Sequence, residues 1–182
     1  LSISKGAKMR KTFILILNLV LFFGCANKNN EHIKVVGNID YSGLSGTWYI
    51  VGLYKNGECN NDEITIDYMI EKDSFSYLKR QISRTKQDKK EAKALVEKGK
   101  IRILKDRSGA LEISRFGLFY DSYNIVNLDV NYKSALIVGD GDFWVIDRKP
   151  QMPFLMREIY TKYLLKHGFK QDQICWKNDE KR

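Results

Sequence analysis

The chain has 182 residues, of which 43% are hydrophobic and 29% are charged. This length suits one domain with its own core and is short for two, and the composition excludes a disordered or low-complexity protein. The formal net charge is +9, but residues 1–24 contain four basic residues and no acid, so the rest carries 27 basic against 22 acidic residues.

The first elements belong to a targeting segment. Met9 is a candidate start, Arg10 and Lys11 form a positive region, and residues 12–23 are almost wholly apolar. Twelve such residues are too few for a membrane-spanning helix, which needs about 20, and typical of a signal peptide. Gly24 and Cys25 then resemble the bacterial lipobox, although Phe22 stands where leucine is usual. An ordinary secretory signal with a chance cysteine is the alternative.

The lipobox resemblance implies a domain organisation and a location. Cleavage after residues 1–24 would leave Cys25 as the lipid-modified N-terminus, followed by a polar tether over residues 25–37. Ala26 follows the cysteine, whereas an aspartate there favours inner-membrane retention in such lipoproteins. The resemblance therefore implies a protein anchored by its lipid to the cell outer membrane, with a folded domain over residues 38–178 in the periplasm.

From residue 39 onward, short apolar runs alternate with Gly, Asn and Asp, as in an antiparallel barrel or sandwich. Within residues 64–70, Ile64, Ile66, Tyr68 and Ile70 fall on one face. Residues 140–142, Asp-Gly-Asp, predict a tight hairpin turn. Further strands are predicted over residues 111–114, 123–128, 134–138 and 143–147.

Two segments have helical spacing. Residues 89–98 place Ala92, Leu95 and Val96 at such intervals, yet we predict a strand there because the surrounding architecture requires one. After Pro153 the period changes to that of a helix ending near Gly168. Its expected apolar face consists of Leu155, Met156, Ile159, Tyr160, Tyr163 and Leu164.

Three motifs in order carry a family resemblance. The first is Gly46-Thr47-Trp48, the second spans residues 132–139, and the third is Arg148 after an apolar strand; residues 116–126 carry a further stretch of likeness. Their order and spacing resemble the lipocalin family, in particular its bacterial and apolipoprotein D-like members, over residues 38–176. The resemblance implies an all-β fold: an eight-stranded antiparallel up-and-down β-barrel with one C-terminal α-helix packed outside.

The signature residues predict how the barrel closes and what lines it. Gly46, Trp48 and Arg148 form the barrel-closing signature, in which a guanidinium over an indole face makes a cation–π pair. Alternation along strands then turns Trp144 and Ile146, and also Ile50, Gly52 and Tyr54, toward the interior. The expected ligand-binding residues are Ile50, Tyr54, Ile66, Tyr68, Tyr120, Trp144 and Ile146. The alternative is that they simply fill a core.

The remaining cysteines are Cys59 and Cys175. In the secreted lipocalins that this chain resembles, cysteines at these two places are paired, which implies a disulfide in an oxidising compartment. Two unpaired thiols are the alternative.

No catalytic or metal-binding pattern is visible. His32 and His167 are the only histidines, and no CxxC or glycine-rich phosphate loop occurs. We therefore predict no enzyme, no catalytic residue, no metal and no cofactor. The expected function is binding, storage or transport of a fatty acid or lysophospholipid. A structural envelope lipoprotein with a filled barrel, acting through protein or membrane contacts, is the alternative.

Residues 79–107 carry 12 basic and four acidic residues. This segment is either a solvated face or a site of attraction to anionic lipid headgroups. It is poor in aromatics, so nucleic acid is not an expected partner. The membrane, through the lipid anchor, and a second copy of the chain, in a homodimer, are the other candidate partners.

Overall fold

The computed structural model describes residues 36–54, 59, 62–71, 74–82, 94–104 and 107–177. The predicted signal peptide, Cys25 and most of the tether lie outside these residues. The barrel strands are β1 (Gly46–Tyr54), β2 (Glu63–Glu71), β3 (Ser74–Ile82), β4 (Ala94–Ile103), β5 (Ala110–Ser114), β6 (Asp121–Leu128), β7 (Ser134–Gly139) and β8 (Phe143–Asp147).

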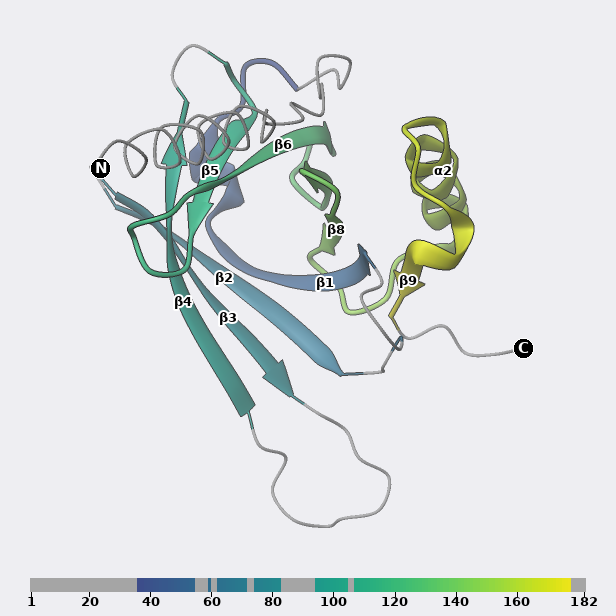
Figure 1. Cartoon of the computed structure of the whole chain (residues 1–182), viewed down its shortest axis with the longest axis horizontal. Coiled ribbons are helices and arrows are strands. Elements are labelled where there is room, and N and C mark those ends of the chain that lie inside the picture. The colour runs from purple at the N-terminus through teal and green to yellow at the C-terminus, as the bar shows by residue number, and fades with distance from the viewer. Residues whose placement is uncertain are drawn as a thin grey trace, which may run out of the picture. The chain divides into compact units, whose positions relative to one another are not determined.

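The eight strands close into one antiparallel barrel, as predicted (Figure 1). Each strand pairs with its neighbours in chain order, and the circle closes because β1 pairs with β2 through residues 46–49 and with β8 through residues 49–53. A short 3-10 helix, η1 (Tyr41–Leu44), precedes β1. Because β1 has a partner strand on each side, its backbone has no edge open to solvent over the barrel.

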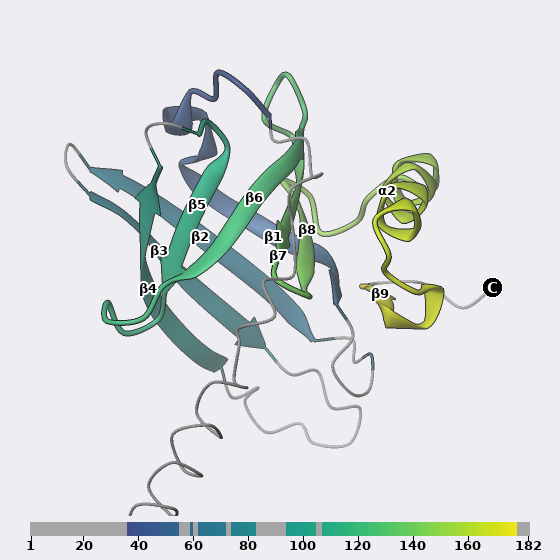
Figure 2. The ribbon, with the colours of Figure 1, turned by 45° about the horizontal axis from the view of Figure 1, so that its top comes forward.

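The C-terminal elements lie against the outside of the barrel (Figures 1 and 2). They are α2 (Phe154–Lys166), η2 (Gln171–Gln173) and β9 (Ile174–Trp176). Strand β9 pairs with residues 52–54 of β1, so it continues the edge along which β2 pairs with the first half of β1. The predicted single helix packed outside the barrel is confirmed.

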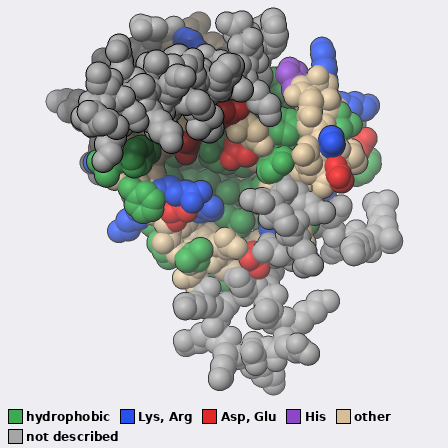
Figure 3. All heavy atoms as spheres, viewed as in Figure 1, with side chains coloured by type: hydrophobic (Ala, Val, Ile, Leu, Met, Phe, Trp, Pro, Cys, Tyr) green, Lys and Arg blue, Asp and Glu red, His purple; other side chains and the backbone are tan. Residues whose placement is uncertain are grey.

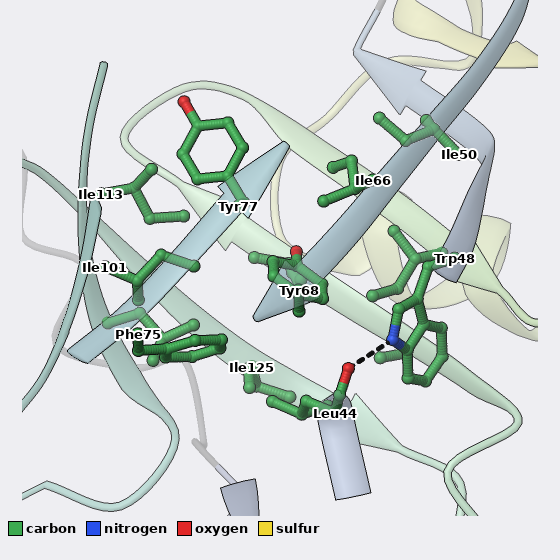
Figure 4. Packing of buried hydrophobic residues seen from close by; sticks show 14 of the residues in the cluster. Leu44, Trp48, Ile50, Ile66, Tyr68, Phe75, Tyr77, Ile101, Ile113 and Ile125 are labelled. Carbon is green, nitrogen blue, oxygen red and sulfur yellow. Dashed lines mark hydrogen bonds between the residues drawn. The ribbon is translucent and has the colours of Figure 1, made fainter. Parts of the chain in front are cut away.

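Buried apolar residues form two separate clusters. One fills the barrel interior and includes Trp48, Ile125 and Ile146, each 0% exposed (Figure 4). The other lies between the barrel wall and α2, where Leu136, Val145 and Leu164 are likewise 0% exposed. The two clusters share the same strands, because alternate residues of a strand point to opposite faces.

A β-bulge in β1 changes which residues face inward. The pairing of β1 with β8 shifts between Ile50 and Gly52, which adds one residue to β1 relative to its partner. Trp48 and Ile50 therefore face the interior before the bulge, and Leu53 faces it afterwards. Tyr54 packs in the outer cluster instead, so the expectation that Tyr54 faces the interior is wrong.

The predicted helix exists, but its buried face is rotated from the expected one. Tyr160, Thr161 and Leu164 are buried, whereas Leu155 is 70% and Ile159 is 47% exposed. Tyr160 anchors this face by hydrogen bonds of its hydroxyl to Ser134 Oγ and Asn127 Oδ1, both at 3.1 Å. These hydrogen bonds hold the Tyr160 side of the helix against the barrel, and the spacing of apolar residues in the sequence does not reveal them.

The segment with helical spacing is a strand where it is described. Residues 94–98 belong to β4, while residues 89–93 lie outside the described residues. Residues 94–101 of β4 pair with β3. Pairing to a neighbouring strand therefore overrides the local preference for helix.

Candidate functional site

Arg148 and Trp48 close one end of the barrel. The Arg148 guanidinium carbon lies 3.8 Å from the centroid of the Trp48 ring, which confirms the expected contact. Trp48 Nε1 donates a hydrogen bond to the Leu44 carbonyl at 2.7 Å (Figure 4). η1 and the end of β8 therefore hold the indole from both sides, and this end of the interior is a packed floor.

A cavity of about 70 Å³ lies above this floor. Its deeper wall is apolar and aromatic, and Figure 4 shows several of these side chains turned into the interior from β1, β2, β3 and β5. Four charged side chains also line it. The lining residues are Ile50, Ile66, Tyr68, Tyr77, Lys79, Glu97, Ile113, Arg115, Asp121, Tyr123 and Trp144.

Two tyrosine rings of the wall pack directly over glycines on neighbouring strands. A Cβ at Gly99 would lie 2.2 Å from the Tyr77 ring, and a Cβ at Gly139 would lie 2.3 Å from the Tyr123 ring. Only glycine leaves room for these rings to lie flat against the wall. Tyr123 in turn packs on Trp144, with 4.6 Å between ring centroids.

The charged part of the wall carries both signs. The Tyr77 hydroxyl donates to Glu97 Oε1 at 2.8 Å, and Arg115 Nε lies 3.6 Å from the same oxygen. Burial, reinforced by the Glu97 carboxylate, raises the pKa of Tyr77, so its phenol stays neutral. Lys79 and Asp121 complete the charged group with one further cation and one further anion.

Trp144 has a weakly satisfied donor in the cavity wall. Its Nε1 is buried and has no hydrogen-bond partner of good geometry among the described residues, and its polar neighbour in the wall is the Tyr68 hydroxyl. Burial raises the pKa of Tyr68, and the contact with Trp144 opposes this shift. A ligand oxygen reaching Trp144 would satisfy a donor that otherwise pays a desolvation cost.

The structure brings together four of the seven expected ligand-binding residues. Ile50, Ile66, Tyr68 and Trp144 line the cavity, whereas Ile146 is fully buried in the interior cluster and outside the cavity wall.

The other two expected residues, Tyr54 and Tyr120, do not line the cavity. Tyr54 contacts Phe143 and Phe169 outside the barrel. Tyr120 lies under the Arg102 guanidinium at 3.7 Å and is absent from the cavity wall, and its expected place along the ligand path stays a prediction.

Sequence reasoning missed Ile113, the two tyrosines and the four charged residues of the wall. Tyr77 lies two residues after the buried Phe75, and Tyr123 lies two residues before Ile125, so the alternation of β3 and β6 carried the signal. Lys79, Glu97, Arg115 and Asp121 carried none, because charged residues normally face solvent.

Cys59 and Cys175 form a disulfide across 116 residues, which confirms the expected pairing. Cys175 is buried and pairs with Leu53 of β1, so the bond ties the C-terminal segment to the chain that follows β1. Cys25 lies outside the described residues.

Among the described residues, no three His, Cys, Asp or Glu side chains group as metal ligands. The same residues contain no helix with the length and apolar character needed to cross a membrane.

Comparison with known proteins gives one consistent result. Residues 39–179 match the family model of the lipocalin-like domain. Outer membrane lipoprotein Blc of Vibrio cholerae is 30% identical over 174 residues, covering 92% of this chain and 98% of that protein. Its namesake in Citrobacter freundii is 30% identical over 148 residues, covering 79% and 81%.

Solved structures agree on the fold. Lobster apocrustacyanin A1 superposes with a TM-score of 0.59 at 14% identity, covering 76% of this chain and 78% of that one. Insecticyanin from the tobacco hornworm Manduca sexta superposes with a TM-score of 0.59 at 12% identity, covering 82% and 85%. At these identities the likeness concerns the barrel architecture alone.

Proposed function

Because this chain belongs to the lipocalin family, with bacterial outer-membrane lipoproteins as relatives, we propose that it binds a fatty acid or lysophospholipid in the cavity between Tyr68 and Trp144. The family and its outer-membrane lipoprotein relatives support binding or transport of a small apolar molecule, and not catalysis. The ligand class and the binding residues are the proposal.

The amphipathic wall of the cavity supports this ligand class. Its deeper part, with Ile50, Ile66 and Ile113, suits an acyl chain, which gains about 0.8 kcal/mol per buried methylene. Its charged part carries Lys79 and Arg115 beside Glu97 and Asp121. A carboxylate or phosphate headgroup finds two cations there, and the ammonium of a zwitterionic lysophospholipid finds two anions.

Entry of an acyl chain requires wall side chains to move. The cavity of about 70 Å³ is well below the roughly 300–1,000 Å³ of ordinary ligand pockets. Trp144 and Tyr123 are partly exposed and stack on each other, so they are the side chains best placed to swing aside. A hydrogen bond from Trp144 Nε1 to a ligand oxygen would offset part of the free-energy cost of this rearrangement.

The narrowness of the cavity favours a second candidate, the structural envelope lipoprotein. A barrel interior packed by Trp48, Ile125 and Ile146 needs no ligand for stability. Such a protein would act through contacts of its outer surface with protein or membrane. It predicts no saturable response to any single-chain lipid.

The proposed location is the outer membrane, through a lipid on Cys25, with the domain on the periplasmic side. The relatives named outer membrane lipoprotein support the membrane, and the lipobox-like Gly24-Cys25 supports the anchor. The periplasmic orientation and the homodimer stay predictions.

Tryptophan fluorescence tests the ligand proposal. Titration with myristate, palmitate, stearate and their lysophospholipids should quench emission saturably, with affinity rising with chain length. Trp144→Phe should remove most of the change. Trp176→Phe is the matched control, because Trp176 contacts Thr161 outside the barrel. Absence of saturation across the whole series would favour the structural candidate.

A further inference from the structure

The loop between β5 and β6 exposes three large apolar side chains within four residues. Phe116, Leu118 and Phe119 are 85%, 79% and 84% exposed. Figure 3 shows hydrophobic side chains gathered over this loop, with basic side chains beside them. An apolar group of this kind on a soluble surface marks a contact site. We call these three residues the apolar loop.

The apolar loop is held in a defined shape. The Gly117 backbone N–H donates to Ser114 Oγ at 2.7 Å, and Ser114 itself is buried. The connection between β5 and β6 runs from Arg115 to Tyr120, and Arg115 and the following residue, Asp121, line the cavity. The three exposed apolar side chains therefore lie between two residues of the cavity wall along the chain.

Basic side chains surround the apolar loop. Lys98, Lys100 and Arg102 alternate along β4 with the inward-facing Gly99 and Ile101, so they share the outer face of the barrel. The Lys100 side chain passes within 3.6 Å of the position of a Cβ on Gly117. We call Lys98, Lys100 and Arg102 the basic stripe. All three are exposed, and so is Arg115.

Acidic residues near the loop offset this charge only in part. Glu112 lies 4.0 Å from Arg102 and Glu97 lies 3.6 Å from Arg115, yet the two arginine side chains remain 60% and 67% exposed. Asp121 is the one exposed acid beside the loop within the described segments 94–104 and 107–128. Exposed cations thus outnumber exposed anions around an apolar centre.

We propose that the apolar loop and the basic stripe dock on an anionic lipid bilayer. Phe116, Leu118 and Phe119 enter the headgroup region, while the basic stripe contacts lipid phosphates. This arrangement places the cavity rim at the bilayer surface. In combination with the proposed ligand function, on which this last step rests, an acyl chain passes between bilayer and barrel with little exposure to water.

The test follows the environment of one inserted tryptophan in the full-length chain. Phe119→Trp reports on the apolar loop, and Leu155→Trp is the matched control, because Leu155 is 70% exposed on α2. The probe is a vesicle of phosphatidylcholine with a minority of phosphatidylglycerol and with bromine in the acyl chains. Emission of the unsubstituted parent is subtracted.

Docking predicts a blue shift and bromine quenching for Phe119→Trp, and neither for Leu155→Trp. Substituting both Lys98 and Lys100 by Gln should lower the affinity for the vesicles about 25-fold, at roughly fivefold for each charge. High salt should weaken it in the same direction. Equal quenching of the two reporters, or no quenching of either, overturns the proposal. A blue shift that grows with protein concentration in the absence of vesicles also overturns it, because a second copy then covers the loop.

A second measurement separates this proposal from the ligand proposal. The variant with Phe116, Leu118 and Phe119 all changed to Ser should bind soluble palmitate as the parent does, but take it up from vesicles more slowly. Loop insertion without palmitate binding by the parent refutes the ligand function and leaves docking intact. Palmitate binding without loop insertion refutes docking alone.

Discussion

Arg148, directly after the last barrel strand, and Trp48, in the first one, hold these two strands together: the guanidinium covers the indole at 3.8 Å and donates hydrogen bonds to three carbonyls before and at the start of β1. Those acceptors are Gly43, Ser45 and Thr47, each at 2.9 Å. One planar cation thus ties η1, the start of β1 and the end of β8 together. Lysine could not span these acceptors, because it lacks the guanidinium fork.

Arg148→Ala should destabilise the fold by about 1–3 kcal/mol, from lost stacking and packing and from four carbonyls, those three and that of Tyr132, left without their donor. Arg148→Lys should lose part of this amount, since a point charge keeps one contact and not the fork. Urea unfolding measures both. Palmitate affinity should be retained, because the floor lies below the cavity. An Arg148→Ala protein as stable as the parent contradicts this account.

Removal of the disulfide should lower the free energy of unfolding, because the unfolded chain without the bond has more conformational freedom. The bond closes a loop of 116 residues, for which the chain-entropy model gives about 4–5 kcal/mol as an upper value. The double variant Cys59→Ser with Cys175→Ser should unfold at lower urea and become insensitive to reductant. The parent in reductant is the control and should match it. Titration of two free thiols from Cys59 and Cys175 in unreduced, unfolded parent protein would rule out the bond.

Asp142 should make stability depend on pH. Burial raises its pKa, against the hydrogen bond from the Tyr123 hydroxyl and the charge of Arg115, which lower it. A carboxyl group with a raised pKa favours folding below its ordinary value of 3.8, and this contribution is lost as the pH rises through the folded value.

Asp142→Asn keeps an acceptor for Tyr123 and removes the charge. The variant should match the parent in stability at low pH and exceed it at neutral pH. Unfolding by urea at several pH values gives the difference. A constant difference across the range would mean that ionisation of Asp142 does not oppose folding.

Cys25→Ser should release the protein from the membrane fraction of the bacterium that makes it, because the lipid has no other attachment point in the proposed lipobox. Cell fractionation with immunodetection measures the change. Cys59→Ser serves as the control for loss of a cysteine as such and should stay in the membrane fraction. Membrane association of Cys25→Ser equal to that of the parent would remove the anchor from this account.

The fold was predictable from the sequence because its signals are local and periodic. Gly46, Trp48 and Arg148 marked the closure, and alternation identified the inner face of β2 through Ile64, Ile66 and Tyr68. Tyr54 was misplaced because alternation assumes an unbroken strand, and the bulge after Ile50 inserts one residue. Gly52 inside β1 is a possible signal of a bulge, but only the register of β1 against β8 places the bulge there.

The cavity was predictable only in its apolar part. Trp144 and Ile66 follow from strand alternation, but Lys79 and Glu97 face inward against the usual preference of charged side chains. The seats of Tyr77 and Tyr123 depend on Gly99 and Gly139 in neighbouring strands. Such pairs become visible only once strand register is known, because each joins residues distant in sequence.

Native mass spectrometry of the purified protein, without detergent and with co-purified lipid retained, tests the central claim most directly. Ile113→Trp fills the cavity wall at a cost of about 1–3 kcal/mol, and Ser122→Trp is the matched control on the exposed face of β6. The account predicts a bound mass of a fatty acid or lysophospholipid on the parent and on Ser122→Trp, and its loss from a cooperatively folded Ile113→Trp. A parent that carries no lipid and takes up none when palmitate or lysophospholipid is added contradicts it.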